Sequence, residues 1–107
     1  MTADHTVEVV LVGELDIASA EDALRRVAEA ERAAPSLLVI DLSTLTFVDS
    51  SGVRVVLVAD DHARAAGRRL AIRLGKGPAL RVFTALGLVD RFEVLPRDDP
   101  SPDQAAR

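Results

Sequence analysis

The chain has 107 residues and a formal net charge of −4, with 49% hydrophobic and 28% charged residues. That length is typical of one domain with a single core, and the composition is that of an ordinary globular protein. Thirteen basic residues are scattered among seventeen acidic ones, so the basic footprint of a nucleic-acid-binding protein is missing. We therefore expect a protein partner or a small ligand, and no nucleic acid.

The composition also bears on metal sites and membranes. The chain has no cysteine, which excludes disulfides and thiolate metal sites, and we expect neither a metal nor a cofactor. No apolar run approaches the roughly 18 residues of a membrane span. The first ten residues, MTADHTVEVV, lack the basic and apolar regions of a signal peptide. The sequence predicts a cytoplasmic protein without a membrane span.

The first half of the chain alternates apolar strands with a helix. Residues 7–16 open with an apolar run that ends at Gly13, which predicts a largely buried strand closed by a turn. The apolar run over residues 36–42, bounded by turn formers, predicts a second buried strand. Between them, small and aliphatic residues recur at helical spacing until Pro35 ends the pattern. Ser19, with Asp22 three residues later, resembles a capping box at the start of this helix.

The second half repeats the alternation. Residues 52–67 predict a helix that ends at a glycine and carries Asp60 on its apolar side. A strand is expected at 68–74, a helix over 75–87 and a short last strand at 91–95. Such alternation predicts an α/β fold in which consecutive strands run parallel.

The domain boundaries follow from composition. We expect residues 1–6 to be a flexible N-terminus and residues 7–95 to form one domain. Residues 96–107, PRDDPSPDQAAR, contain three prolines and no large apolar residue, which predicts a disordered C-terminal tail.

The stretch FVDSSG, residues 47–52, lies between an apolar run and the second helix. In open α/β sheets, sites are built in such strand-to-helix loops. A structural interpretation is favoured from the residues alone: the hydroxyl of Ser50 or Ser51 caps the helix. In that interpretation Asp49 favours the positive end of the helix, and Gly52 allows close packing.

A serine nucleophile is a weaker interpretation of the same stretch. It needs a base, usually histidine, within hydrogen-bond reach. The chain offers only His5 and His62. His62 lies about 16 Å along the helix from Ser51, at 1.5 Å per residue, and His5 falls in the flexible N-terminus. We therefore expect no catalytic residue and no enzyme.

The turn LGKGPAL, residues 74–80, carries the only lysine of the chain. Backbone N–H groups at the start of a helix can hold an anion, which makes a nucleotide-binding protein one alternative. The pattern G-x-x-x-x-G-K-[ST] of a phosphate-binding loop is absent, however. A structural turn into a helix that starts at Pro78 is favoured.

Three stretches, in this order, resemble the STAS domain proteins of the anti-sigma factor antagonist type. They are GELD at 13–16, LSTLTFVDSSGV at 42–53 and LRVFTALGLVDRFEVL at 80–95. The resemblance covers about Val7 to Leu95. It implies a single STAS-like α/β domain, with a mixed, mostly parallel β-sheet flanked by helices, in a bacterial cytoplasmic protein.

In that family, an anti-sigma factor that is also a serine kinase phosphorylates the serine directly after the aspartate of the motif, and a serine phosphatase reverses this. The resemblance implies that Ser50 is the phosphoryl acceptor. It also implies that the unphosphorylated chain binds the anti-sigma factor kinase and so releases a sigma factor. The implied partner-binding residues are Asp16, Asp49, Ser50, Ser51, Gly52 and Arg54.

Two features depart from the family pattern. Members often begin with a two-stranded hairpin, whereas six residues precede Val7 here, so the first strand is short or missing. Arg54 stands where the family frequently has a small residue. Because it follows Ser50 by four positions in a helix, its guanidinium either pairs with a phosphate on Ser50 or lies in solvent.

Two other functions stay open. The chain is alternatively a STAS module of another assembly, such as a stress-signalling complex or a lipid transport system. The nucleotide-binding protein suggested by the turn at 74–80 is the second alternative.

Overall fold

The computed structural model describes residues 5–96. The elements in chain order are β1 (Thr6–Val10), β2 (Gly13–Leu15), α1 (Ala20–Glu31), β3 (Leu37–Asp41), β4 (Leu45–Val48), α2 (Ser50–Ala65), β5 (Arg69–Arg73), α3 (Pro78–Ala85), a 3₁₀ turn (Val89–Arg91) and β6 (Glu93–Leu95). Residues 1–4 and 97–107, which include most of the two segments expected to be flexible, lie outside the described residues. The flexibility of those residues stays a prediction.

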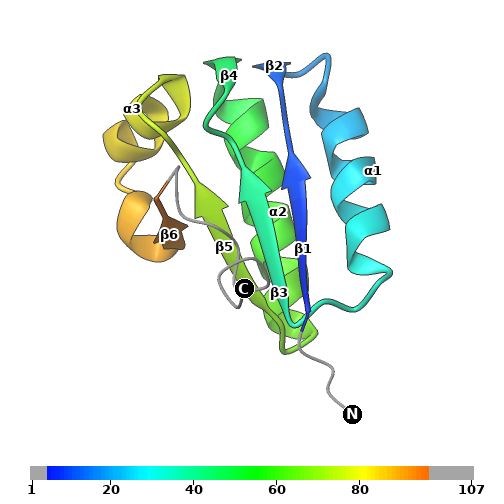
Figure 1. Cartoon of the computed structure of the whole chain (residues 1–107). Coiled ribbons are helices and arrows are strands. Elements are labelled where there is room, and N and C mark those ends of the chain that lie inside the picture. The colour runs from blue at the N-terminus through cyan, green and yellow to red at the C-terminus, as the bar shows by residue number, and fades with distance from the viewer. Residues whose placement is uncertain (1–4, 97–107) are drawn as a thin grey trace.

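The strands form two parallel arrangements. One sheet has the order β1-β3-β5-β6, and β2 pairs with β4 separately. The four strand pairs among residues 5–96 are all parallel. Figure 1 shows α2 behind the larger sheet, α1 beside β1 and α3 near the upper end of β5, with the carboxyl ends of the strands at the top. The predicted α/β domain with a mostly parallel sheet flanked by helices is confirmed.

The strand predicted to end at a turn at Gly13 is present as β1, but the segment 7–16 also contains β2, a second strand in a different sheet that the sequence did not predict. β1 pairs with β3, and its last ladder contact is followed by a hydrogen bond from Leu11 N to Asp41 O, 3.0 Å long. Gly13 then adopts a φ of +80°, which glycine tolerates and which turns the chain towards β4. The sequence did not indicate β4, because the first and last of its four residues are buried and the two between them are exposed, which is not the strict alternation of a half-buried strand.

The N-terminal boundary also differs from the expectation. β1 begins at Thr6, and the backbone N–H of His5 donates to Ser36 Oγ at 2.9 Å. In return, the N–H of Ser36 donates to His5 O at 3.0 Å. Residues 5 and 6 therefore belong to the folded domain, and His5 lies at the amino end of β1, opposite the carboxyl ends of the strands (Figure 1).

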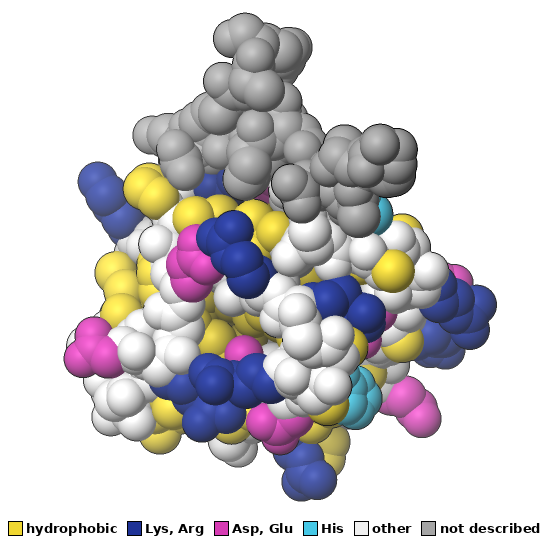
Figure 2. Space-filling view, turned by 90° about the horizontal axis from the view of Figure 1, so that it is seen from below, with side chains coloured by type: hydrophobic (Ala, Val, Ile, Leu, Met, Phe, Trp, Pro, Cys, Tyr) yellow, Lys and Arg dark blue, Asp and Glu magenta, His cyan; other side chains and the backbone are white. Residues whose placement is uncertain are grey.

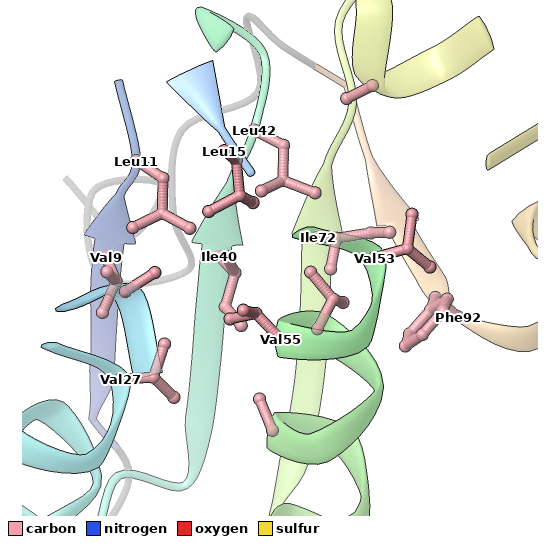
Figure 3. Packing of buried hydrophobic residues seen from close by; sticks show 14 of the residues in the cluster. Val9, Leu11, Leu15, Val27, Ile40, Leu42, Val53, Val55, Ile72 and Phe92 are labelled. Carbon is pink, nitrogen blue, oxygen red and sulfur yellow. The ribbon is translucent and has the colours of Figure 1, made fainter. Parts of the chain in front are cut away.

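The core lies between the helices and one face of the larger sheet. Val9, Ile40 and Ile72, from β1, β3 and β5, are at most 6% exposed. Figure 3 shows these side chains pointing to the same side, towards Val27 of α1 and Val55 of α2. Burying each such aliphatic side chain stabilises the fold by about 1.5–3 kcal/mol relative to leaving it in water.

Helix α2 ends just before Gly67, as the sequence predicted. Gly67 has a φ of +72°, and its N–H donates to Arg64 O at 3.1 Å. The N–H of Arg68 donates to Ala63 O at 2.8 Å. These two bonds form a Schellman motif, which satisfies carbonyl groups that the helix itself leaves open.

Asp60 is the buried acidic residue of α2. Its residue exposure is 4%, as the helical spacing predicted, and its carboxylate accepts from Arg64 Nε at 2.8 Å and from an Arg91 guanidinium N–H at 3.3 Å. Because Arg91 belongs to the 3₁₀ turn, this carboxylate connects α2 with the segment that leads into β6.

We predict that Asp60→Ala lowers the free energy of unfolding by about 1.5–3 kcal/mol, the range for hydrogen bonds to charged groups. Urea denaturation followed by circular dichroism measures the change. Asp61→Ala is the matched control. The Asp61 side chain is 70% exposed, and its ion pair with Arg91 is longer, at 3.6 Å, than that of Asp60 with Arg91. We expect less than about 0.5 kcal/mol for the control; equal losses in the two variants would contradict the role of Asp60.

Candidate functional site

The site begins where β2 and β4 end side by side. Leu15 and Val48 are the last partners in the register of the two strands, and an aspartate follows each of them. The N–H of Asp49 donates to Leu15 O at 3.2 Å. This bond extends the pairing by one step and places the residues after β2 next to the start of α2.

Asp49 is the N-cap of α2. Its Oδ1 accepts from Ser51 N at 2.9 Å and from Gly52 N at 3.2 Å, while its carbonyl accepts from Val53 N at 3.1 Å. The prediction that Ser50 or Ser51 caps the helix is therefore wrong. An extended backbone at Asp49, with ψ −171°, lets its carboxylate reach both N–H groups, and the helix begins directly afterwards at Ser50.

The hydroxyls of Ser50 and Ser51 are without hydrogen-bond partners among the described residues. Ser50 is exposed as the first residue of α2, and Ser51 is half-buried. Within residues 5–96, neither hydroxyl makes a hydrogen bond to another protein group. The Ser50 Oγ is thus a surface hydroxyl at the positive end of a helix, where an anion is stabilised.

Gly52 is buried against β2. A Cβ at this position would lie 2.6 Å from Leu15 O and 2.7 Å from Leu15 Cγ, closer than real Cβ atoms come. The close packing expected of Gly52 is confirmed. It brings the first turn of α2 against the end of β2, so the two strand ends and the helix start form one rigid junction.

Asp16 organises the turn between β2 and α1. Its Oδ1 accepts from Ala18 N at 3.0 Å and from Ser19 N at 3.2 Å. Ser19 Oγ donates to Glu14 O at 2.8 Å and makes no capping hydrogen bond to α1. The capping box predicted for Ser19 and Asp22 is therefore wrong, because the Ser19 hydroxyl is used by the turn that precedes the helix.

Arg54 lies on the exposed side of α2, four residues after Ser50. Side chains at this spacing are neighbours on a helix surface. No ion pair involves Arg54 in the part of the chain that the structure describes. Its guanidinium is thus without an ion pair about one helical turn from Ser50, and its pairing with a phosphate stays a prediction.

Three exposed apolar side chains lie on or next to the two strands of this junction, and the sequence did not predict them. They are Val12 (67% exposed), Ile17 (81%) and Phe47 (47%), which we call the apolar rim. Val12 and Ile17 flank β2, and Phe47 lies on β4, opposite Glu14 in the register. The available signal was weak: Ile17 is an isolated apolar residue in a turn, outside both the strand alternation and the helical spacing.

The turn at 74–80 has a structural explanation. Gly75 has a φ of +66°, and a Cβ there would lie 2.7 Å from Ser43 Cβ, so the glycine allows this loop to pack on the β3–β4 turn. α3 starts at Pro78, as predicted. A hollow of about 560 Å³ beside the turn has a mainly aliphatic lining: Leu74, Gly75, Lys76, Leu80, Val94, Leu95 and Pro96. Such a lining offers little for a nucleotide to bind beyond the single Lys76.

The described residues offer neither a metal-binding cluster nor a membrane-spanning helix. No group of three or more His, Asp or Glu side chains in residues 5–96 is arranged to hold a metal ion. Nor does any helix in that range have the length and apolar character needed to cross a bilayer.

Comparisons with known proteins agree with the geometry. A sequence model of the STAS domain matches residues 2–99. The anti-sigma factor antagonist SpoIIAA in its unphosphorylated form has a similar structure, with 25% sequence identity, a TM-score of 0.72, and coverage of 98% of this chain and 87% of that chain. A comparison with curated proteins finds no significant match.

Two further solved structures are similar. The Bacillus cell fate determinant SpoIIAA in its phosphorylated form has 27% identity and a TM-score of 0.70, covering 100% of this chain and 96% of that chain. An anti-sigma factor antagonist from Mycobacterium paratuberculosis has 25% identity and a TM-score of 0.75, with coverage of 96% and 86% respectively. The chain belongs to the STAS domain family.

We predict that Asp49→Ala lowers the free energy of unfolding by about 1 kcal/mol, because two N–H groups of α2 lose their acceptor. Asp49→Asn should retain most of the stability, since asparagine is an equally good N-cap. Ser51→Ala should change the stability by less than about 0.5 kcal/mol, as is usual for a side chain without a partner. Denaturant melts decide the point, and a larger loss for Ser51→Ala than for Asp49→Ala would contradict the assignment of the cap.

Proposed function

We propose that this STAS domain protein is an anti-sigma factor antagonist, whose binding to an anti-sigma factor serine kinase is switched off by phosphorylation of Ser50. The observation that supports this best is the uncommitted, exposed Ser50 hydroxyl at the start of α2, directly after the capping Asp49. The similarity to structures of one antagonist in unphosphorylated and phosphorylated forms supports a phosphoryl switch on this fold.

The local structure tolerates a phosphate on Ser50. Phosphorylation adds about −1.5 to −2 charges at neutral pH, and the start of a helix stabilises negative charge. Asp49 already satisfies the N–H groups of Ser51 and Gly52, so the phosphate need not displace the serine hydroxyl from a capping bond. We expect the fold to survive the modification.

The chemistry of transfer belongs to the partners. Ser50 Oγ attacks the γ-phosphorus of ATP, the bond to the leaving ADP breaks, and the hydroxyl proton passes to a base on the kinase. A serine phosphatase restores the hydroxyl by transferring the phosphoryl group to water. This chain contributes a positioned acceptor and, in our proposal, no catalytic residue of its own.

The proposed partner surface is centred on Ser50 and includes Asp16, Asp49, Ser51 and Arg54. Asp16 and Asp49 are half-buried, and each uses Oδ1 to fix its own loop. Gly52 is buried, so its contribution is to hold α2 against Leu15. If Ser50 lies within a close interface, a phosphate there brings bulk, desolvation and repulsion from facing acidic groups. A loss of about 3 kcal/mol weakens binding more than a hundredfold.

The cellular setting follows from the same proposal. A serine kinase that sequesters a sigma factor acts in the cytoplasm, and a cytoplasmic location is what we predict for this chain.

We predict that Ser50 is the only residue of the chain phosphorylated by the partner kinase. Ser50→Ala should bind the kinase with unchanged affinity and accept no phosphate. Ser50→Asp should bind at least tenfold more weakly, because it imitates part of the phosphate charge. Mass spectrometry of the peptide over residues 47–58 and binding by calorimetry measure the two effects.

Ser51→Ala is the control for this experiment, since Ser51 is the neighbouring hydroxyl and is half-buried. It should accept one phosphate, as the unchanged chain does. Equal kinase affinity for Ser50→Asp and the unchanged chain would rule out the switch.

We predict that Arg54 holds the phosphate of phospho-Ser50 and slows its removal. Arginine pairs with phosphate through two N–H groups, and Arg54 is unpaired among residues 5–96. Arg54→Gln should then speed dephosphorylation several-fold. It should also lower the melting temperature of the phosphorylated form more than that of the unmodified form.

Arg32→Gln is the matched control, because Arg32 is an exposed arginine at the end of α1 without an ion pair in the described part of the chain. It should leave the dephosphorylation rate unchanged. Equal thermal effects of Arg54→Gln on both forms would show that Arg54 does not contact the phosphate.

A further inference from the structure

The two ends of the molecule differ in charge. The segments that build the site, residues 11–24 and 41–55, contain six acidic residues (Glu14, Asp16, Glu21, Asp22, Asp41 and Asp49) and one basic residue, Arg54. Figure 2 views the opposite end, where dark blue basic side chains spread over the face. A hollow of about 240 Å³ lies between α2, β5 and the segment that leads into β6. It is lined by Asp60, Arg64, Arg68, Arg69, Leu70, Arg91 and Glu93. These two segments are thus mostly acidic, while Arg26 lies beside Glu14 and Asp22, and the loop that carries Lys76 packs on the turn between β3 and β4.

The apolar rim lies on this acidic end. Leu15 and Val48 form one register pair and are both buried, whereas their neighbours Glu14 and Phe47 form the preceding pair and are both exposed. Phe47 is 47% exposed although Leu45, two residues earlier in the strand, is buried, and the register of β2 and β4 shifts between Gly13 and Glu14. Ile17 follows Asp16 in the turn beside Asp49 and is 81% exposed.

Single exposed apolar residues are normal on protein surfaces, but clusters indicate interaction sites. Among residues 5–96, six large apolar side chains are exposed, and three of them belong to the short segment formed by β2, β4 and their flanks. The other three, Val10, Leu86 and Val94, lie on β1, at the end of α3 and on β6. The concentration at the Ser50 end therefore needs a partner to explain it.

We propose that the apolar rim, with Ile17 as its most exposed residue, is the anchor of the partner interface, and that the partner presents an apolar pocket bordered by Lys and Arg side chains. This inference rests on the proposed function and specifies the chemistry of the kinase surface. The pocket receives Ile17 and Phe47, and its basic border faces Glu14, Asp16 and Asp49.

The two components of this surface have separable kinetic effects. Complementary charges accelerate the encounter of two proteins and are screened by salt. Desolvated apolar anchors mainly determine how slowly a formed complex dissociates. The acidic residues should therefore set the association rate, and the apolar rim the dissociation rate.

The experiment measures binding of the whole chain to the anti-sigma factor kinases encoded in the same genome, each purified and immobilised with ADP on a biosensor surface. Ile17→Asn and Phe47→Asn replace an exposed apolar side chain with a polar one of similar or smaller size. Each should raise the dissociation constant at least tenfold, mainly through faster dissociation. Thermal melts of both variants should match the unchanged chain, because neither side chain is buried.

Leu86→Asn is the matched control, since Leu86 is 54% exposed at the C-terminus of α3, outside the apolar rim. Its affinity for the kinase should be unchanged. Raising NaCl from 50 to 500 mM should slow association of the unchanged chain severalfold and leave dissociation nearly constant.

The outcomes separate this inference from the function on which it rests. If no kinase binds the unchanged chain, the proposed function is wrong. If a kinase binds and neither rim variant weakens it, the function stands and the anchor is wrong. If the association rate does not depend on salt, the proposal that Lys and Arg side chains border the partner's pocket is wrong. Sedimentation showing a dimer that Ile17→Asn dissociates would assign the apolar rim to a second copy of this chain and overturn the inference.

Discussion

The contact between the end of β2 and the start of α2 is the constraint on which the rest of the site depends. The Leu15 carbonyl accepts from Asp49 N–H, and Gly52 packs so closely on Leu15 that any larger residue would collide with it. Because β2 pairs with β4, the strand that leads into the helix, this pairing and the Asp49 cap together fix where α2 begins. The exposed residues around Ser50 are therefore carried on a rigid frame, which limits the entropy lost when a partner binds.

The fold explains why such a site is possible in so small a chain. The larger sheet buries its aliphatic face against α1 and α2 and supplies most of the core. The β2–β4 pair adds little buried surface of its own, with Leu15, Leu45 and Val48 as its buried side chains. Its other residues remain exposed, so this short pair can present polar and apolar groups to a partner while the larger sheet maintains stability.

The sequence predicted the elements with strong periodicity and missed those determined by contacts distant in the chain. The helices at α1 and α2 and the strands β3 and β5 were recognisable because their apolar residues recur over many positions. β4 was missed because only its pairing with β2 defines it. Ser19 was predicted to cap α1 because its residue type and its spacing from Asp22 fit a capping box. In the structure its hydroxyl instead donates to Glu14 O and accepts from Asp16 N. The loop between β4 and α2 that carries Ser50 was recognised as a strand-to-helix loop from the sequence, whereas the assignment of the cap to Asp49 required the backbone angles.

That assignment has a consequence for how a phosphoryl switch can work. If the Ser50 hydroxyl capped α2, phosphorylation would have to break the cap first, at a cost of about 0.5–2 kcal/mol, which shifts an equilibrium roughly 2- to 30-fold. Part of the effect of the phosphate would then act on the fold. With the cap on Asp49, both N–H groups keep their acceptor whatever the state of Ser50. The charge and bulk of a phosphate would consequently act on the surface that a partner meets, so that binding and folding remain independent of each other.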